Sequence, residues 1–199
     1  MKVIFEVESV RQKQEGGLSP NEIDYYESWV KVPSNFQLTY KSKYTVYGIR
    51  YRTDQSVRFM IVDDSGVIYP KIYPAEFFSI EDSRLSQLWD TSDRYYPIKL
   101  PRYPSWVTFK QFLEDDSYYE DLINGNQQAI SDFLVVKRRM DLEFPDSSIP
   151  YAEVIQGNWI KCAHCGEVWE NFSTEGIVVC PKNMELSNNP LWTDHKVKR

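Results

Sequence analysis

The chain has 199 residues with a net charge of −6 and an isoelectric point near 5.1, and 42% of its residues are hydrophobic. This composition is typical of a folded globular protein and excludes wholesale disorder. The acidic balance argues against broad binding to a phosphate backbone. Aromatic residues make up 15% of the chain, enough to fill a small β-rich core or to furnish a contact surface for another protein.

The N-terminal residues give no sign of export. Residues 1–7 lack the apolar stretch of a signal peptide, and no window approaches the roughly 18 apolar residues of a membrane span. The chain has three cysteines, an odd number that fits a disulfide framework poorly and favours a metal site in a reducing compartment. We therefore expect a cytoplasmic protein.

The first domain, residues 1–104, reads as β-rich. Apolar residues alternate with charged ones over residues 2–10, and β-branched and aromatic residues dominate later segments, which predicts short strands. The later predicted strands cover residues 44–51, 57–62, 67–69 and 77–80, with a tight turn at 63–66. Strands so short and close together predict an antiparallel sheet or a small SH3-like barrel, and a Tyr- and Pro-rich connector over 90–104 ends the domain.

Residues 105–150 read as a helical segment packed on that sheet. The spacing of Trp106, Phe109 and Phe112 predicts a helix from Ser105, and Ser117-x-x-Glu120 resembles a capping box that opens a second one. A third helix follows the break at residues 124–126. Its apolar stripe is Ala129, Ile130, Phe133, Leu134 and Met140. The Pro- and Ser-containing segment 144–150 is then a candidate domain boundary. The predicted fold class is α+β.

All three cysteines lie in the C-terminal segment, residues 151–199. Cys162 and Cys165 form a CxxC pair followed by glycine, and Cys180 follows fifteen positions after the pair with a proline behind it. Two thiolates two residues apart can converge on one zinc ion, which is most often bound by four tetrahedral thiolate or imidazole ligands. A redox CxxC motif would be expected to open a helix after a strand, and the apolar segments around these cysteines instead suggest hairpins.

This pattern resembles the zinc-ribbon family over about residues 158–192. Cys162 and Cys165 match the first knuckle of a ribbon, and Cys180 with Pro181 matches the start of the second. The resemblance implies a β-hairpin tail that holds a structural zinc ion. The sequence departs from the family at Asn183, which stands where the fourth cysteine is expected.

Several groups could complete such a site. His195 is the preferred fourth ligand because imidazole binds zinc well, and the alternatives are Asp194, Asn183 or a water molecule. His164 lies between two cysteines and is expected to point outward. A ribbon that has lost its metal is the remaining possibility. The predicted metal ligands are thus Cys162, Cys165, Cys180 and His195.

The rest of the sequence lacks a recognisable catalytic constellation. It has only two histidines and no nucleophile-elbow, P-loop or dinucleotide-binding motif, and the carboxylate pairs at 63–64 and 115–116 fall at turns. We therefore expect a non-enzymatic protein-binding module with a basic protein partner, in one form an immunity or inhibitor protein that neutralises a basic toxin or nuclease. The first alternative is a zinc-ribbon protein that binds nucleic acid or acts in transcription, for which the basic residues 137–139 and 196–199 would supply phosphate contacts. The second is an enzyme with an unfamiliar site, which the sequence neither supports nor excludes.

Overall fold

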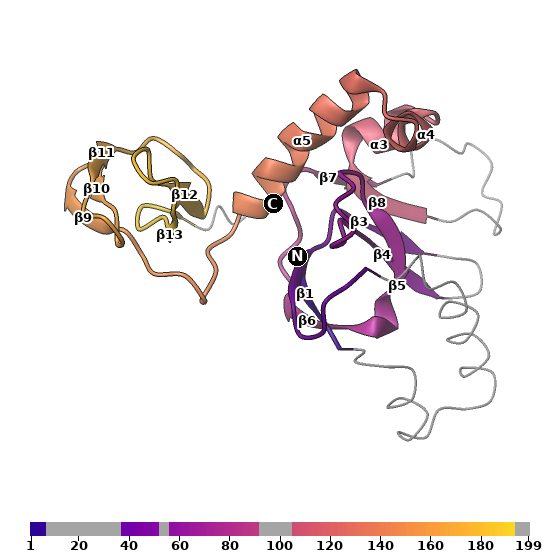
Figure 1. Ribbon diagram of the computed structural model, residues 1–199, viewed down its shortest axis with the longest axis horizontal. Helices are drawn as coiled ribbons and strands as arrows, with labels where there is room; N and C mark the ends of the chain where they lie inside the picture. The colour runs from indigo at the N-terminus through magenta and orange to yellow at the C-terminus, as the bar shows by residue number, and fades with distance from the viewer. Residues whose placement is uncertain (7–36, 52–55, 92–104, 194–199) are drawn as a thin grey trace. The chain divides into compact units, whose positions relative to one another are not determined.

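The computed structural model describes residues 1–6, 37–51, 56–91 and 105–193. The chain divides into two compact units, Met1–Val136 and Lys137–Arg199, which are described separately below (Figure 1). The predicted connector lies outside the described residues from position 92 onward, and so do Asp194, His195 and the basic C-terminal residues. The described secondary structure mixes antiparallel sheets with helices, which confirms the α+β class.

The N-terminal unit contains two antiparallel sheets. Their strands are β1 (Lys2–Phe5), β2 (Lys43–Thr45), β3 (Gly48–Tyr51), β4 (Val57–Ile61), β5 (Lys71–Pro74), β6 (Phe78–Asp82), β7 (Trp89–Thr91) and β8 (Ser105–Phe109). One sheet has the order β2-β1-β6 and the other the order β5-β4-β3-β8-β7, and a short 3-10 helix, η2 (Ala75–Phe77), connects β5 to β6. Within the described residues these strands do not close into one barrel, so the predicted SH3-like barrel is not reproduced at that level of detail.

The hydrophobic core of this unit draws on both sheets. Val3 and Phe5 of β1 are buried and alternate with half-buried neighbours, as the period-two pattern predicts. Phe59 and Ile61 of β4, together with Tyr73 of β5, contribute to the same cluster from the five-stranded sheet. Burial of large apolar and aromatic side chains from two sheets is the main stabilising contribution that such a unit has available.

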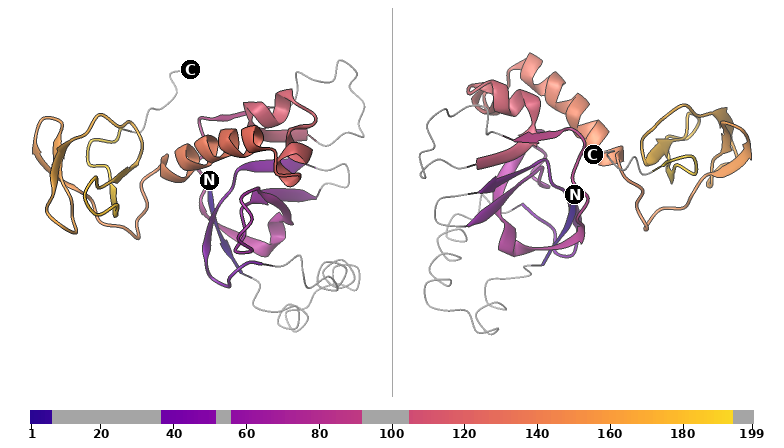
Figure 2. Two further views of the ribbon diagram at one scale, coloured as in Figure 1. Left: turned by 45° about the horizontal axis from the view of Figure 1, so that its top comes forward. Right: turned by 180° about the vertical axis from the view of Figure 1, so that it is seen from behind.

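The helices of the N-terminal unit lie on the same side of its sheets (Figures 1 and 2). They are α3 (Lys110–Glu114), α4 (Tyr118–Ile123) and α5 (Gln127–Leu142), the last of which continues into the C-terminal unit. Phe133 of α5 packs against Tyr47 and Phe109 with ring centroids 5.6 and 5.9 Å apart. The helices are thus held to the sheet by aromatic contacts.

Helix α5 begins at an effective cap. Asn126 Oδ1 accepts hydrogen bonds from the backbone N–H groups of Gln128 and Ala129 at 3.0 and 3.2 Å, which satisfies two of the donors that a helix leaves open at its start. Helix α4 forms where the capping box predicts a helix, but the Ser117 side chain makes no capping hydrogen bond. The Ser117 hydroxyl donates to Asp115 at 2.7 Å instead of capping the helix.

Two sequence predictions in this unit are wrong. The helix predicted from Ser105 starts only at Lys110, because residues 105–109 form strand β8 between β3 and β7. The strand predicted over 67–69 belongs to the connection between β4 and β5, and pairing resumes at Lys71. In both cases pairing between strands decides the conformation, and the local spacing of apolar residues in the sequence does not reveal this pairing.

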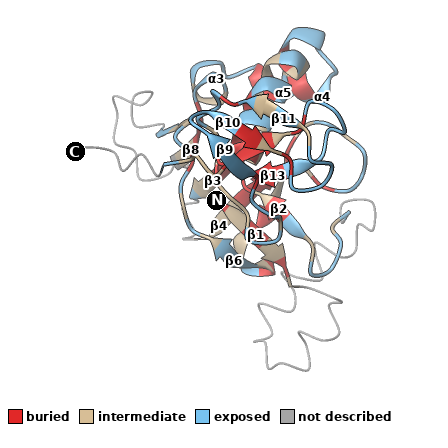
Figure 3. Cartoon of the chain, turned by 90° about the vertical axis from the view of Figure 1, so that its left-hand side faces the viewer, coloured by how far each residue is buried: buried red, intermediate tan, exposed pale blue. Residues whose placement is uncertain are grey.

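The C-terminal unit is built from two small antiparallel sheets. One has the order β11-β10-β9, from β9 (Glu153–Gln156), β10 (Trp159–Lys161) and β11 (Val168–Glu170), and the other pairs β12 (Ile177–Val179) with β13 (Leu186–Asn188). Ile160, Ala152 and Val178 form its buried cluster, against which Trp169 and Leu191 pack. Strand β9 is exposed along its whole length (Figure 3).

The described helices include no segment long and apolar enough to cross a lipid bilayer.

Candidate metal centre

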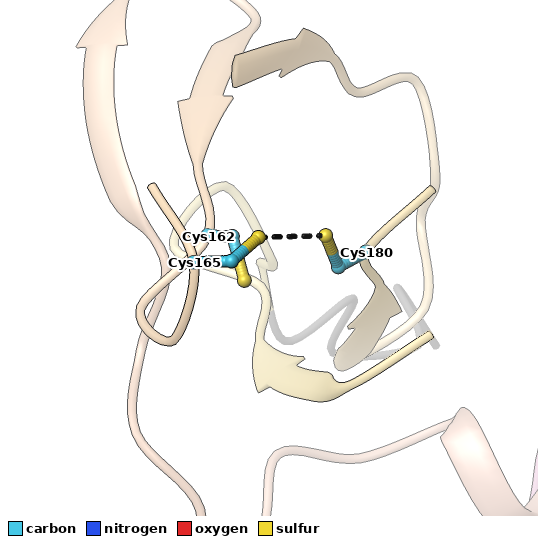
Figure 4. A group of neighbouring side chains, drawn as sticks. All are labelled: Cys162, Cys165 and Cys180. Atoms are coloured by element: carbon cyan, nitrogen blue, oxygen red, sulfur yellow. Dashed lines mark hydrogen bonds between the residues drawn. The ribbon is translucent and has the colours of Figure 1, made fainter. Parts of the chain in front are cut away.

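The three cysteines converge in the C-terminal unit, as the sequence predicts (Figure 4). Cys162 directly follows β10, Cys165 lies in the turn between β10 and β11, and Cys180 directly follows β12. Their sulfur atoms all lie within 4.8 Å of one another, and the Cys165 and Cys180 sulfurs are 3.6 Å apart. All three cysteines are free thiols. The cluster is therefore compatible with a metal ion held by three sulfur ligands.

Two loops with the same backbone pattern present these sulfurs. In the first knuckle, residues 162–167, Cys162 N–H donates to Glu167 O at 2.8 Å and Gly166 N–H donates to Cys162 O at 3.2 Å. In the second knuckle, residues 180–185, Cys180 N–H donates to Glu185 O at 2.9 Å and Met184 N–H donates to Cys180 O at 3.0 Å. The two knuckles are therefore equivalent residue by residue, eighteen positions apart.

The backbone dihedral angles support the same equivalence. Gly166 has a φ of 74°, and Met184, at the equivalent position, has a φ of 61°. A left-handed conformation is ordinary for glycine and uncommon for a residue such as methionine, so the turn at Met184 is held by its surroundings. The residue equivalent to Cys165 is Asn183.

Hydrogen bonds from the knuckle prepare one thiol for ionisation. Desolvation of Cys162 raises the thiol pKa, but the backbone N–H groups of Cys165 and His164 outweigh it and lower the pKa to about 7. At Cys165 the N–H of Glu167 acts to lower the pKa, yet desolvation and the two neighbouring thiols together raise it. The first knuckle thus favours the thiolate of Cys162, the form in which a cysteine binds a metal ion.

The predicted fourth ligand, His195, lies outside the described residues, as does Asp194. His164 points away from the sulfurs as expected, because its Nε2 lies 3.2 Å from the backbone oxygen of Leu186. Asn183 Oδ1 accepts a hydrogen bond from the N–H of Glu185 at 3.1 Å. Among the described residues, no histidine or carboxylate joins the three cysteines in a group of possible metal ligands.

Two buried asparagines hold the knuckle-bearing strands in place, and the sequence analysis missed both. Asn188 and Asn189 are each 1% exposed. The Asn188 amide donates to the backbone oxygens of Asp146 and Ile149 at 2.7 Å, so it ties the predicted boundary segment 144–150 to β13. The Asn189 amide donates to the oxygens of residues 173 and 175 at 3.0 and 2.8 Å.

These bonds give the buried asparagine amide groups their hydrogen-bond partners. The signal available in the sequence was the adjacent Asn-Asn pair within the ribbon-like segment, where a solvent-exposed turn was the simpler interpretation.

The carboxylate pairs lie at turns, as the sequence indicates. Asp63 is buried and accepts hydrogen bonds from Tyr73 and Ser65, and its Oδ2 lies 2.8 Å from Lys71 Nζ. Asp115 accepts the N–H and hydroxyl of Ser117 at 2.9 and 2.7 Å. Both carboxylates are engaged in holding local backbone.

The chain matches no protein-family model, and comparisons with curated proteins and with solved structures found no match.

Proposed function

We propose that the C-terminal unit binds one zinc ion through Cys162, Cys165 and Cys180, and that the ion has a structural role. The observation that carries this proposal is the spacing of the sulfurs. Zinc bound tetrahedrally at about 2.3 Å places its sulfur ligands about 3.8 Å apart, which is close to the 3.6 Å between Cys165 and Cys180. The ion would join β10 to β12 and so connect the two small sheets of the unit.

A structural ion suits these surroundings better than a catalytic one. A catalytic zinc site needs a base near the metal and residues that orient the ligands. Neither knuckle glutamate belongs to the group of possible metal ligands among the described residues. Glu167 lies 3.4 Å from Lys182 Nζ, and the Glu185 backbone closes the second knuckle. When bound, the metal would cross-link the segments that follow β10 and β12. The backbone hydrogen bonds of the two knuckles hold the loops that present the sulfur atoms.

We further propose that the protein is a non-enzymatic protein-binding module and that the outer surface of the C-terminal sheet contacts the partner. Trp159 and Val168 are 47% and 42% exposed, and both lie on the face of the sheet opposite to buried Ile160. Ile155 at the register shift of β9 and Phe172 after β11 are also exposed. Exposed aromatic and aliphatic side chains gathered on one small unit are typical of protein contact sites.

The charge of the unit indicates a basic partner. Between residues 151 and 193 the chain has two lysines and five glutamates, Lys161, Lys182, Glu153, Glu167, Glu170, Glu175 and Glu185. Both lysines are paired with glutamates, at 3.0 and 3.4 Å. An excess of negative charge on the unit speeds encounter with a positively charged protein. The specific form we propose is an immunity or inhibitor protein for a basic toxin or nuclease.

The same charges weigh against the alternative, a zinc-ribbon protein that binds nucleic acid. That function needs unpaired cations that follow a phosphate backbone. In the triplet 137–139, Lys137 lies 2.6 Å from Asp141 of the same helix, so one of the three cations is paired with a carboxylate. We propose a cytoplasmic location for the protein, because free thiols and a thiolate-bound zinc ion both suit a reducing environment.

The N-terminal unit supports the proposal only in general terms. Its strands form two antiparallel sheets that do not close into one barrel within the described residues. A fold alone assigns no partner. The proposed binding surface is the C-terminal sheet because exposed Trp159 and Val168 lie together on one of its faces.

Affinity capture from the source cells tests this function. The wild-type chain, Trp159→Ser and Tyr40→Ser would be compared as baits, with bound proteins identified by mass spectrometry. Tyr40 is an exposed aromatic residue of the other unit and so gives a matched control. We expect one stoichiometric basic protein that is lost with Trp159→Ser and retained with Tyr40→Ser. Recovery of nucleic acid alone at about 50 mM salt, with capture that weakens steeply as salt rises, would contradict the proposal and favour the alternative.

A further inference from the structure

The two knuckles share one backbone pattern but differ at one position that can offer a ligand to the metal. Cys162 corresponds to Cys180, Glu167 to Glu185, and Cys165 to Asn183, because the backbone hydrogen bonds and left-handed turns repeat eighteen residues apart. We propose that Asn183 occupies the fourth corner of the metal centre and leaves that coordination position to an exchangeable ligand, an imidazole or thiolate supplied from outside the two knuckles. This inference rests on the proposed zinc site.

The Asn183 side chain is held as the Cys165 side chain is held. Asn183 Oδ1 accepts the N–H of Glu185 at 3.1 Å, two residues ahead in the chain. The Cys165 sulfur accepts the N–H of Glu167, also two residues ahead in the chain. Because each polar side-chain atom accepts the same backbone bond of its knuckle, the Asn183 oxygen takes the place of a sulfur ligand.

Neighbouring donors in the described residues are engaged in other contacts. His164 Nε2 lies 3.2 Å from the Leu186 oxygen, and Glu167 lies 3.4 Å from Lys182 Nζ. The cluster of possible ligands contains only the three cysteines among the described residues. The second knuckle therefore offers the metal a carboxamide where the first offers a thiolate.

A carboxamide oxygen is a weak ligand for zinc, which prefers thiolate and imidazole. An ion held by three sulfurs would therefore keep one coordination position that a stronger donor can take. Asn183 and Cys165 are both exposed, so a donor can approach from solvent. The donor can come from the protein's own His195 or from another molecule. In either case the metal centre gains a ligand at the position that Asn183 marks.

Cobalt substitution tests this inference, because the absorption of bound Co²⁺ reports the number of thiolates and the fourth ligand. The full chain and three variants, Asn183→Cys, Lys182→Cys and His195→Ala, would be loaded with Co²⁺ and titrated with imidazole. Lys182→Cys is the matched control, since it adds a thiol one position away, at the equivalent of outward-pointing His164. Competition with a chelator gives the relative affinities for Zn²⁺.

We expect Asn183→Cys to raise the thiolate-to-cobalt absorption by about one third and to tighten zinc binding by roughly 100-fold, because a fourth thiolate replaces a carboxamide. Lys182→Cys should change neither quantity. Imidazole should shift the spectrum of the wild-type protein but not that of Asn183→Cys. A wild-type spectrum altered by His195→Ala would identify the tail as the source of the donor. If His195→Ala leaves the spectrum unchanged and added imidazole shifts it, the position is open to a donor from another molecule.

The failures are distinguishable. If the wild-type protein binds Co²⁺ and Asn183→Cys leaves spectrum and affinity unchanged, the inference about Asn183 is wrong while the metal site stands. If neither protein binds Co²⁺, the proposed zinc site is wrong as well. Metal binding by Asn183→Cys alone would confirm the corner position and contradict a bound metal in the natural chain.

Discussion

At the scale of single residues, Asp63 is the best-engaged carboxylate of the N-terminal unit. Its side chain is fully buried in the loop after β4, where Lys71, Ser65 and Tyr73 contact it. Desolvation alone would raise its pKa, but these three partners outweigh desolvation and hold the pKa below the ordinary value of 3.8. The buried charge is stabilised in the folded state, so removing it leaves an ammonium group and two hydroxyls without their partner.

We predict that Asp63→Asn lowers the free energy of unfolding by about 2 to 4 kcal/mol, because a buried ion pair loses one member. Since the folded-state pKa is depressed, the contribution of Asp63 is complete above the unfolded-state value and is lost as pH falls through the folded value. Stability of the wild type should therefore drop below about pH 4 more steeply than that of Asp63→Asn. Urea unfolding at several pH values measures this, with exposed Asp116→Asn as control. Equal pH dependence of wild type and Asp63→Asn would contradict the assignment.

At the scale of elements, the start of β12 depends on close approach between two backbone segments. A Cβ atom at Gly176 would lie 2.3 Å from the Pro145 nitrogen and 2.4 Å from the Phe144 carbonyl carbon. Gly176 N–H also donates to Glu143 O at 2.9 Å, and its oxygen accepts from Asn189 N–H at 2.8 Å. The neighbours are backbone atoms, so a side chain can be accommodated only if one segment moves away.

We therefore predict that Gly176→Ala destabilises the C-terminal unit by about 3 kcal/mol, near the upper end of overpacking costs. Hydrogen exchange of residues 176–189 should speed up, while exchange in β3 and β4 stays unchanged. Exposed Thr174→Ala, two residues away, is the control and should leave both regions as they are. Unchanged protection of residues 176–189 in Gly176→Ala would show that the packing described here is wrong.

The elements also show where sequence reasoning succeeds. The approach of Cys162 to Cys165 follows from the local geometry of a CxxC turn, which a few neighbouring residues contain in full, and it could be predicted. The approach of Cys180, fifteen residues further along the chain, could be expected only from the resemblance to a zinc ribbon. Strand β8 could not, because its conformation depends on pairing with β3, which precedes it by more than fifty positions. The helical spacing of its aromatic residues arises because Trp106 lies in the strand and Phe112 in the following helix, and the two rings still meet at 4.9 Å.

The equivalence of the two knuckles could be predicted from the sequence only in part. Glu167 and Glu185 stand at the same offset from their leading cysteines, which was visible in the sequence, but a backbone hydrogen bond carries no mark of side-chain type. Met184 made the equivalence of the two knuckles harder to predict, because glycine is the usual residue in a left-handed conformation. Only the structure shows that the second knuckle has the same backbone as the first.

At the scale of the whole molecule, the two units draw their stability from different sources. The N-terminal unit buries a cluster of large side chains between two sheets. The C-terminal unit has a small buried cluster of Ala152, Ile160 and Val178, supplemented by asparagine hydrogen bonds. Units of this size commonly need a metal or disulfides to fold, and this one has three thiols in place and no disulfide. The stability of the C-terminal unit therefore depends most on whether zinc is bound.

The most direct test is native mass spectrometry of the full chain, combined with limited proteolysis in the presence and absence of a chelator. We predict one zinc ion per chain, its loss in Cys180→Ser, and rapid cleavage within residues 151–193 once the metal is removed, whereas the N-terminal unit stays intact. Thr174→Ala should keep its zinc and its resistance. A metal-free chain whose residues 151–193 resist protease would contradict the account, because the small core and the asparagine network would then suffice without the ion.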